Sequence, residues 1–170
     1  MALLPIRIYG DPVLRKKSES VAQITPEIKK IVRDMTEIME KNDGIGLAAP
    51  QVGISKSIIT METKDGPLGF INPRVLKESQ EKIITEEGCL SFPGLFLKIK
   101  RPKSVEVESW VLNREKRLVK VKTSGLLARI LLHELDHLNG VLFIDRISFI
   151  QRLKIRRTLK KIKSFRGSYR

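Results

Sequence analysis

The sequence predicts an α+β fold in which antiparallel strands pack around a central helix, with one helix before the strands and a basic helix at the C-terminus. Three patterns support this prediction. Apolar residues recur at helical spacing over 25–44. Short runs of alternating apolar and polar residues occur over 55–123, and 124–138 is rich in leucine. With 41% hydrophobic residues and 170 residues in all, the chain can bury a core without disulfides, so we expect one domain over 1–170.

The first helix is predicted over TPEIKKIVRDMTEIMEKNDG. Thr25 can cap it, Pro26 suits its first turn, and Glu27 suits the positive end of the helix dipole. Asn42-Asp43-Gly44 should end it. Its apolar stripe should face the core and consists of Ile28, Ile31, Val32, Met35, Ile38 and Met39.

Strands are predicted after a segment of small residues over 44–53 that lacks strong periodicity. Gly66-Pro67 and Asn72-Pro73 mark breaks in the strand region. The short loop lengths favour antiparallel pairing of several of the runs. The predicted strands are SIITME, GFINPRVL, KIITEE, SVEVESWV and LVKVKT.

A second helix should start near Ser124 and run to Leu138, where Asn139-Gly140 ends it. Its leucines cover more than one face, so most of it should be buried. A third helix should follow Ser148, with an apolar stripe of Ile155, Leu159 and Ile162.

The chain is strongly basic, with 33 Lys and Arg against 19 Asp and Glu and a net charge of +14. Such an excess favours polyanionic partners, RNA or DNA above all. Residues 149–170, the basic C-terminal helix and tail, are either a solvated helix face or a segment that docks on a large polyanion. They contain no acid and nine basic residues, namely Arg152, Lys154, Arg156, Arg157, Lys160, Lys161, Lys163, Arg166 and Arg170.

The single cysteine, Cys89, excludes an intramolecular disulfide and suggests a reducing compartment. The N-terminus MALLPIRIYGDPVL does not have the pattern of a signal peptide, and no apolar run reaches membrane-spanning length. We therefore expect a cytoplasmic protein with no membrane partner.

The segment HELDH holds both histidines of the chain, His133 and His137, with Glu134 between them. Residues four apart lie on one face of a helix, so both rings can reach one metal ion, and Glu134 can act as a general base toward water at that metal. The alternative is two ordinary histidines on a buried helix. Burying them with a glutamate and no partners would be costly, which favours the metal site.

The third ligand is open at this point. Zinc peptidases with this motif take a further His or Glu downstream, but no His follows His137 and no Glu follows Glu134, which leaves Asp145. Upstream, Cys89 in EEGCLSFPG would complete a Cys/His₂ set with one open position, as catalytic sites require. A lone thiol is also a common core residue.

A metal hydrolase needs hydrogen-bond donors where negative charge develops. Gln51 in GIGLAAPQ offers an amide, and Leu90 offers a backbone N–H beside Cys89. Structural roles also fit, since Gln51 can cap a loop, and Gly44 and Gly46 can serve a turn.

Taken together, GIGLAAPQ (44–51), EGCLS (87–91) and HELDH (133–137) stand in the order and approximate spacing of peptide deformylase, which this chain closely resembles. The resemblance runs from GDPVLR (10–15) into the basic C-terminal helix. It implies that the metal ligands are Cys89, His133 and His137, that Glu134 is the acid–base catalyst, and that the substrate oxygen is held by Gln51 and the Leu90 N–H.

One residue departs from the family pattern. The family usually has glutamine immediately before the first histidine, where this chain has Leu132. Because that residue is not a ligand, we expect the chemistry to survive without the hydrogen bond that a glutamine would supply.

The resemblance also implies the reaction, which is N-terminal processing during protein biosynthesis: removal of the formyl group from formyl-methionine, with release of formate. Cys/His ligation by itself points to zinc. The family more often uses ferrous iron, so we expect one divalent metal per chain, Fe²⁺ natively, with Zn²⁺ or Ni²⁺ as alternatives. The expected partners are the nascent formyl-Met polypeptide and, through the basic C-terminal helix, the ribosome.

Further residues are expected around the substrate. Ile130 should line a methionine pocket with Leu126 and the stem of Arg129, while Ile45 and Gly46 hold the substrate backbone; plain core packing is the alternative for each. From the family pattern and charge, Glu87 and Arg101 should pair and brace the loop that carries Cys89.

Two other functions are retained as alternatives. A metallopeptidase built on HELDH would need Asp145 as its downstream ligand. A nucleic-acid-binding protein with a structural metal would suit the charge, but aromatic residues are only 5% of the chain and no nucleic-acid-binding motif is recognisable.

Overall fold

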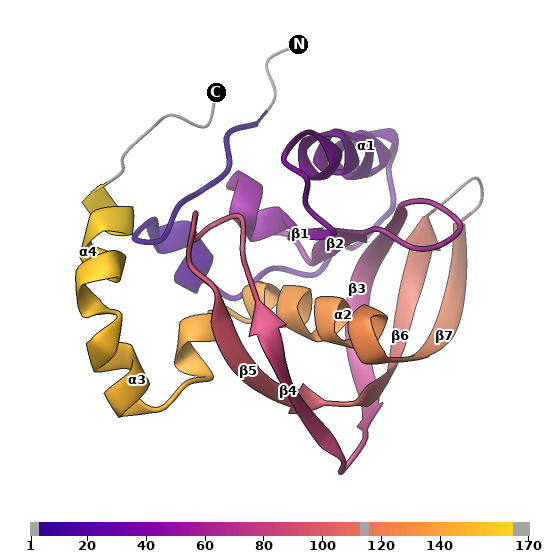
Figure 1. The fold of residues 1–170 in the computed structure, drawn as a ribbon. Helices are drawn as coiled ribbons and strands as arrows, with labels where there is room; N and C mark the ends of the chain where they lie inside the picture. The colour runs from indigo at the N-terminus through magenta and orange to yellow at the C-terminus, as the bar shows by residue number, and fades with distance from the viewer. Residues whose placement is uncertain (1–3, 113–115, 165–170) are drawn as a thin grey trace.

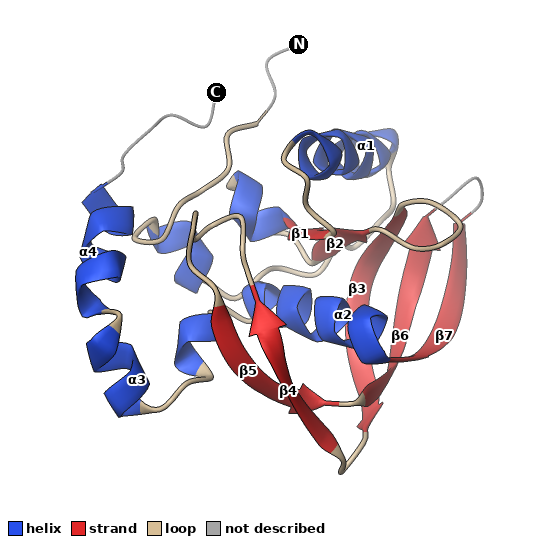
Figure 2. Ribbon diagram, viewed as in Figure 1, coloured by secondary structure: helices blue, strands red, loops and turns tan. Residues whose placement is uncertain are grey.

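The computed structural model describes residues 4–112 and 116–164 of the chain. In these residues, helices pack against two antiparallel sheets (Figure 2). The α-helices are α1 (Pro26–Lys41), α2 (Gly125–Leu138), α3 (Phe149–Lys154) and α4 (Arg156–Ser164). The strands are β1 (Gly46–Ala48), β2 (Ile58–Met61), β3 (Leu68–Glu78), β4 (Lys82–Glu87), β5 (Leu97–Pro102), β6 (Ser104–Leu112) and β7 (Lys116–Ser124).

The larger sheet has the strand order β1-β2-β3-β6-β7, and every neighbouring pair is antiparallel. The smaller sheet is the hairpin of β4 and β5, in which Glu87 lies opposite Leu97 and Ile83 opposite Arg101. The predicted combination of helices with antiparallel strands is therefore confirmed.

Helix α1 forms as its sequence predicts. The Thr25 hydroxyl accepts a hydrogen bond from the Ile28 N–H at 3.3 Å, which satisfies one of the unpaired amides of the first turn. Met35 and Met39 are fully buried and pack in one apolar cluster with Leu47 of β1 and Ile58 of β2. This packing fixes the segment that leads from α1 into β1.

Helix α2 contacts strands of both sheets (Figure 1). Every residue from 128 to 138 is buried, and Leu131, Leu132 and Leu135 pack in one cluster with Phe70 and Val107 of the larger sheet. The helix thereby carries the HELDH segment between the larger sheet and the β4–β5 hairpin.

Two strands do not follow from the sequence pattern. β1 is only three residues long, Gly-Leu-Ala, too short to show an alternation. β5 alternates in the structure, because Ile99 and Arg101 are both buried, but a buried arginine does not read as an inward-facing residue. Asn72-Pro73 does not end β3; it produces a register shift between Ile71 and Arg74.

The prediction of a single continuous helix after Ser148 is wrong. The segment forms two helices, and the break falls at Ile155. The break lets α4 bury Leu159 and Ile162, whereas no residue of α3 is buried. Arg166 and Arg170 of the predicted tail lie outside the described residues.

None of the described helices is long and apolar enough to cross a membrane.

Candidate metal centre

Three potential metal ligands converge at the junction of α2 and the β4–β5 loop. Cys89 follows β4, and His133 and His137 lie one turn apart on α2. One ligand atom from each of the three lies within 4.8 Å of the other two, and Cys89 Sγ is 3.2 Å from His137 Nε2. The structure thus brings together the set Cys89, His133 and His137.

The loop that carries Cys89 is held by aromatic packing. Phe92, three residues later, donates its N–H to the Cys89 carbonyl at 2.8 Å and is almost fully buried. Its ring lies 4.9 Å, centroid to centroid, from both Tyr9 and Phe143. Cys89 itself packs against the same apolar cluster. The thiol is therefore fixed by a folded loop rather than a mobile turn.

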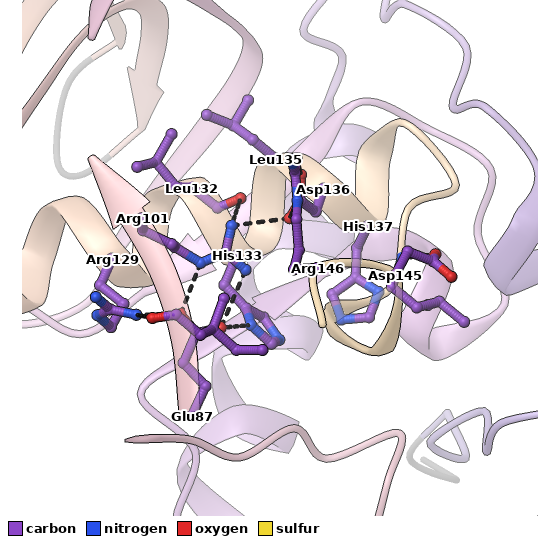
Figure 3. Close-up of polar contacts among 12 residues, drawn as sticks. Glu87, Arg101, Arg129, Leu132, His133, Leu135, Asp136, His137, Asp145 and Arg146 are labelled. Carbon is purple, nitrogen blue, oxygen red and sulfur yellow. Dashed lines mark hydrogen bonds and ion pairs between the residues drawn. The ribbon is translucent and has the colours of Figure 1, made fainter. Parts of the chain in front are cut away.

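Glu87 orients the first histidine (Figure 3). Its Oε2 lies 2.9 Å from His133 Nδ1, which leaves the other ring nitrogen for a metal. The predicted pair with Arg101 is present and bidentate, with Nε 2.6 Å from Oε1 and Nη2 3.0 Å from Oε2. Arg101 also donates to Asp136 Oδ2 at 2.8 Å, and Arg146 donates to both oxygens of Asp136.

The ionisable groups around the ligands shift one another's pKa values. Burial acts to raise the pKa of Glu87, but hydrogen bonds from His133 and Arg101 outweigh it and lower that pKa to about 2. Burial acts to lower the pKa of His133, but hydrogen bonds to Cys89 and Glu87 raise it to about 10. Burial and the neighbouring His133 charge hold the pKa of His137 well below its ordinary value. Of the two histidines, His133 therefore holds a proton more tightly than His137.

Glu134 is buried beside the ligands. Burial raises the pKa of its carboxyl to about 7, which keeps a proton exchangeable near neutrality. Its Oε2 has no hydrogen-bond partner among the residues that the structure describes, and neither does Nδ1 of His137. A buried polar atom without a partner is costly, and it points to a ligand or water at this position.

The donor set fits a divalent transition metal. One thiolate and two imidazoles suit a borderline or soft cation, and three protein ligands leave a coordination position open for chemistry. Metal-bound histidines commonly hydrogen-bond a carboxylate through their other ring nitrogen, as His133 Nδ1 does with Glu87.

The side-chain amide of Gln51 points toward the ligand atoms. Its Oε1 accepts the Ala48 N–H at 2.8 Å, which fixes the amide orientation. Its Nε2 then lies 3.5 Å from Cys89 Sγ and 3.4 Å from Ser91 Oγ, and the residue is 1% exposed. The amide donor therefore faces the ligand cluster.

A cavity of about 450 Å³ opens onto the ligands. At its rim, Ile45 is 51% exposed and Leu126 is 64% exposed, whereas Ile130 is buried in its wall. The predicted site residues that line it are Ile45, Gly46, Gln51, Cys89, Leu90, Leu126, Arg129, Ile130, His133 and Glu134. His137 lies deeper, at 1% exposure.

The alternative third ligand, Asp145, does not lie with the two histidines. Asp145 pairs with Arg15 and with Arg152, and its Oδ2 accepts the Leu142 N–H at 2.9 Å. With its oxygens held this way, it is not part of the ligand group. This removes the ligand that the metallopeptidase alternative required.

Sequence reasoning missed three features of the site. The guanidinium of Arg129 is buried and bonded, a role signalled only by a charge within an apolar helix. Asp136 belongs to the arginine network, and Phe96 lines the cavity at 62% exposure. Leu132 turns its side chain into the core cluster, and its carbonyl lies 3.4 Å from Arg101 Nη1.

Comparison with known proteins identifies the family. Residues 3–153 match the family described as Polypeptide deformylase. A peptide deformylase of Thermotoga neapolitana is 47% identical over 163 residues, which cover 95% of this chain and 98% of that protein.

Solved structures agree. The crystal structure of the Thermotoga maritima peptide deformylase superimposes with a TM-score of 0.82 at 45% identity, over 87% of this chain and 99% of that one. The Ehrlichia chaffeensis peptide deformylase, solved in complex with actinonin, gives a TM-score of 0.89 at 38% identity, over 99% and 100% of the two chains. Neither the metallopeptidase nor the nucleic-acid-binding alternative is favoured by these matches. The chain therefore belongs to the polypeptide deformylase family of metal-dependent hydrolases, which remove the formyl group from the N-terminal formyl-methionine of newly synthesised proteins.

Proposed function

We propose that Cys89, His133 and His137 hold one divalent metal ion and that Glu134 is the acid–base catalyst of deformylation. The observation that carries this proposal is the convergence of the three donors beside a buried, unpartnered Glu134 oxygen at the end of the cavity. When bound, the metal supplies Lewis acidity, which lowers the pKa of water and polarises a carbonyl group.

The chain's own groups account for the remaining steps. Glu134 takes a proton from the attacking water and later delivers a proton to the leaving amine, for which a pKa raised by burial is suited. Gln51 Nε2 and the Leu90 N–H donate hydrogen bonds to the formyl oxygen as it becomes negative. The products are formate and a free amino terminus.

The cavity supports the substrate assignments. Leu126, Ile130 and the aliphatic stem of Arg129 would hold the methionine side chain, and Ile45 with Gly46 would hold the peptide backbone. All five line the cavity that ends at the ligands.

We propose Fe²⁺ as the native metal, with Zn²⁺ or Ni²⁺ able to occupy the same donors. The thiolate in the set makes an iron site sensitive to oxidation. Metal analysis and turnover of anaerobically and aerobically prepared protein would test this. Full activity with zinc alone, in protein free of iron, would contradict it.

The activity itself is tested by formate release from formyl-Met-Ala. Wild-type protein should release formate, chelator should abolish the release, and Glu134→Gln should lower kcat by about 10²–10⁴-fold while metal content is retained. Undiminished turnover in Glu134→Gln would remove Glu134 from the mechanism, and undiminished metal content in Cys89→Ser would remove Cys89 from the ligand set.

The whole chain, 1–170, is proposed as a single catalytic domain organised around α2, acting in the cytoplasm, where formyl-methionine chains emerge. Its basic C-terminal helices are proposed to dock on the ribosome. Arg157, Lys160 and Lys161 are exposed on α4, and ribosomal RNA is a polyanion.

Deleting residues 149–170 would not test the docking cleanly, because Leu159 and Ile162 are buried in the core. Charge reversal is the sharper design. Arg157→Glu/Lys160→Glu/Lys161→Glu should weaken ribosome binding and flatten its salt dependence, with formyl-Met-Ala turnover unchanged. The control variant, Lys17→Glu/Lys29→Glu/Arg33→Glu, reverses the same number of charges at exposed residues elsewhere. Equal loss of binding in both variants would reduce the effect to net charge.

A further inference from the structure

Arg129 lies one turn before His133 on α2, and its side chain is 8% exposed. Its guanidinium has three acceptors. Nη1 donates to Glu87 Oε1 at 2.6 Å and to the Ile99 carbonyl at 3.0 Å, and Nη2 donates to the Ile83 carbonyl at 2.9 Å. Ile83 belongs to β4 and Ile99 to β5, so one side chain fastens α2 to both strands of the hairpin whose loop carries Cys89.

Glu87 is fully engaged by its neighbours (Figure 3). Oε1 receives Arg101 Nε at 2.6 Å and Arg129 Nη1 at 2.6 Å, while Oε2 receives Arg101 Nη2 at 3.0 Å and lies 2.9 Å from His133 Nδ1. An ionised carboxylate offers about four acceptor sites, and all four are used here. The carboxylate therefore has one orientation in which every contact is kept, and that orientation sets the ring of His133.

We propose that Arg129 is a positioning residue for the metal centre. It holds Glu87 in the orientation that aims His133, and it fixes the spacing between α2 and the hairpin, and hence between the histidines and Cys89. This inference rests on the proposed function, because it takes His133 and Cys89 as ligands.

The role is separable from the pocket role given to the same residue. Arg129 lines the cavity, where its aliphatic stem provides apolar surface. Arg129→Met keeps an unbranched stem of similar length and removes the guanidinium with all three hydrogen bonds. Arg129→Lys keeps the charge, but a single ammonium cannot reproduce the planar fork that serves Glu87 and two carbonyls together.

The experiment measures metal binding directly. Co²⁺ affinity is determined by chelator competition, and the visible absorption of the Co²⁺-loaded protein reports ligand geometry. Arg129→Met should weaken Co²⁺ binding by about 10- to 100-fold and shift the absorption band, as loss of an outer-shell partner typically does. Arg129→Lys should weaken binding by about threefold or more. KM for formyl-Met-Ala should change less than kcat in both.

The matched control is Arg74→Met, which removes an exposed arginine paired with Glu108 on the larger sheet. It should leave Co²⁺ affinity, spectrum and turnover unchanged. Circular dichroism identifies the variants that fold, and Arg129→Lys carries the test if Arg129→Met does not fold.

Unchanged Co²⁺ affinity and spectrum in either folded Arg129 variant would overturn the inference. A raised KM with unchanged Co²⁺ affinity would show that Arg129 only lines the substrate pocket. Failure of the proposed function looks different, because wild-type protein would then bind no stoichiometric Co²⁺ or Cys89→Ser would bind it equally well.

Discussion

A Cβ placed on Gly46 would lie 2.6 Å from Oε1 of Glu134 and 2.7 Å from Cγ2 of Ile130. The backbone of β1 therefore passes directly against the proposed catalytic acid, at the wall of the methionine pocket. A side chain at Gly46 would force both groups, or the backbone of β1, to move, since contacts under 3.0 Å are not tolerated.

Gly46→Ala should accordingly lower kcat/KM for formyl-Met-Ala by about 10- to 100-fold, less than the full contribution of a general base. Metal content should be unchanged, because none of the three atoms nearest to that Cβ belongs to Cys89, His133 or His137. Gly66→Ala is the control: it lies at a φ of +97° with open space around it, so it should cost stability without changing turnover. Wild-type kinetics in Gly46→Ala would show that Glu134 can relocate freely.

Gln51→Glu tests the oxyanion donor with nearly unchanged shape. The new carboxylate can still accept the Ala48 N–H, but it has no N–H to donate toward the substrate oxygen. We expect kcat to fall by about 10²–10³-fold with metal still bound, as for loss of one such donor. Steady-state kinetics and metal analysis check this, and a loss of metal together with activity would instead assign Gln51 to the integrity of the ligand loop.

Arg101→Ala should destabilise the fold strongly. Its side chain is 4% exposed, and its loss leaves the buried carboxylates of Glu87 and Asp136 short of partners. Removing one member of such a buried network typically costs about 3–5 kcal/mol. Chemical denaturation compares it with Lys103→Ala, whose exposed pair with Glu81 should contribute less than about 1 kcal/mol. Similar losses in the two variants would refute the bracing role.

Asp145 should contribute pH-dependent stability. Burial acts to raise the pKa of its carboxyl, but the hydrogen bond from Arg15, with those from Leu142 and Arg152, lowers it below the ordinary value of 3.8. A lowered pKa means that the folded state binds the proton less readily than the unfolded state, so the stabilisation is complete above the unfolded pKa and is lost as pH falls through the folded one. The difference in unfolding free energy between wild type and Asp145→Asn should therefore be constant above about pH 5 and shrink below it. Metal-free protein is used for the denaturation series, and a difference that stays flat down to pH 2 would contradict the assignment.

Much of the fold follows from local pattern. The stripe from Ile28 to Met39 and the alternation in β6 are predicted because their burial repeats with a helical or strand period. β5 escapes this logic because Arg101 is buried by partners that come from β4 and α2. The break at Ile155 escapes it because the direction of α4 is set by the core cluster that receives Leu159 and Ile162.

The candidate site was predictable where chemistry dictates residue type. The HELDH motif is compatible with only a few functions. Cys89, Gln51 and Leu90 were candidates from their residue chemistry, and the resemblance selected them over the alternatives. The network behind them was not predictable in full. Only the stem of Arg129 was assigned a role, and Asp136 was assigned none. The partners Glu87 and Ile83 of Arg129, and Arg101 of Asp136, lie 35 to 46 residues away in the chain, so the contacts appear only when the hairpin is placed against α2.

The apolar cluster that buries Leu159 and Ile162 of α4 is also the one on which Phe92 and Cys89 pack. Helix α4 and the loop that carries Cys89 therefore pack on the same core cluster. Proteolytic trimming that removes α4 would withdraw packing from beneath Cys89, so C-terminal digestion should release metal before it unfolds the larger sheet. Helix α4 thus helps to keep the metal centre folded, independently of any partner that its charges bind.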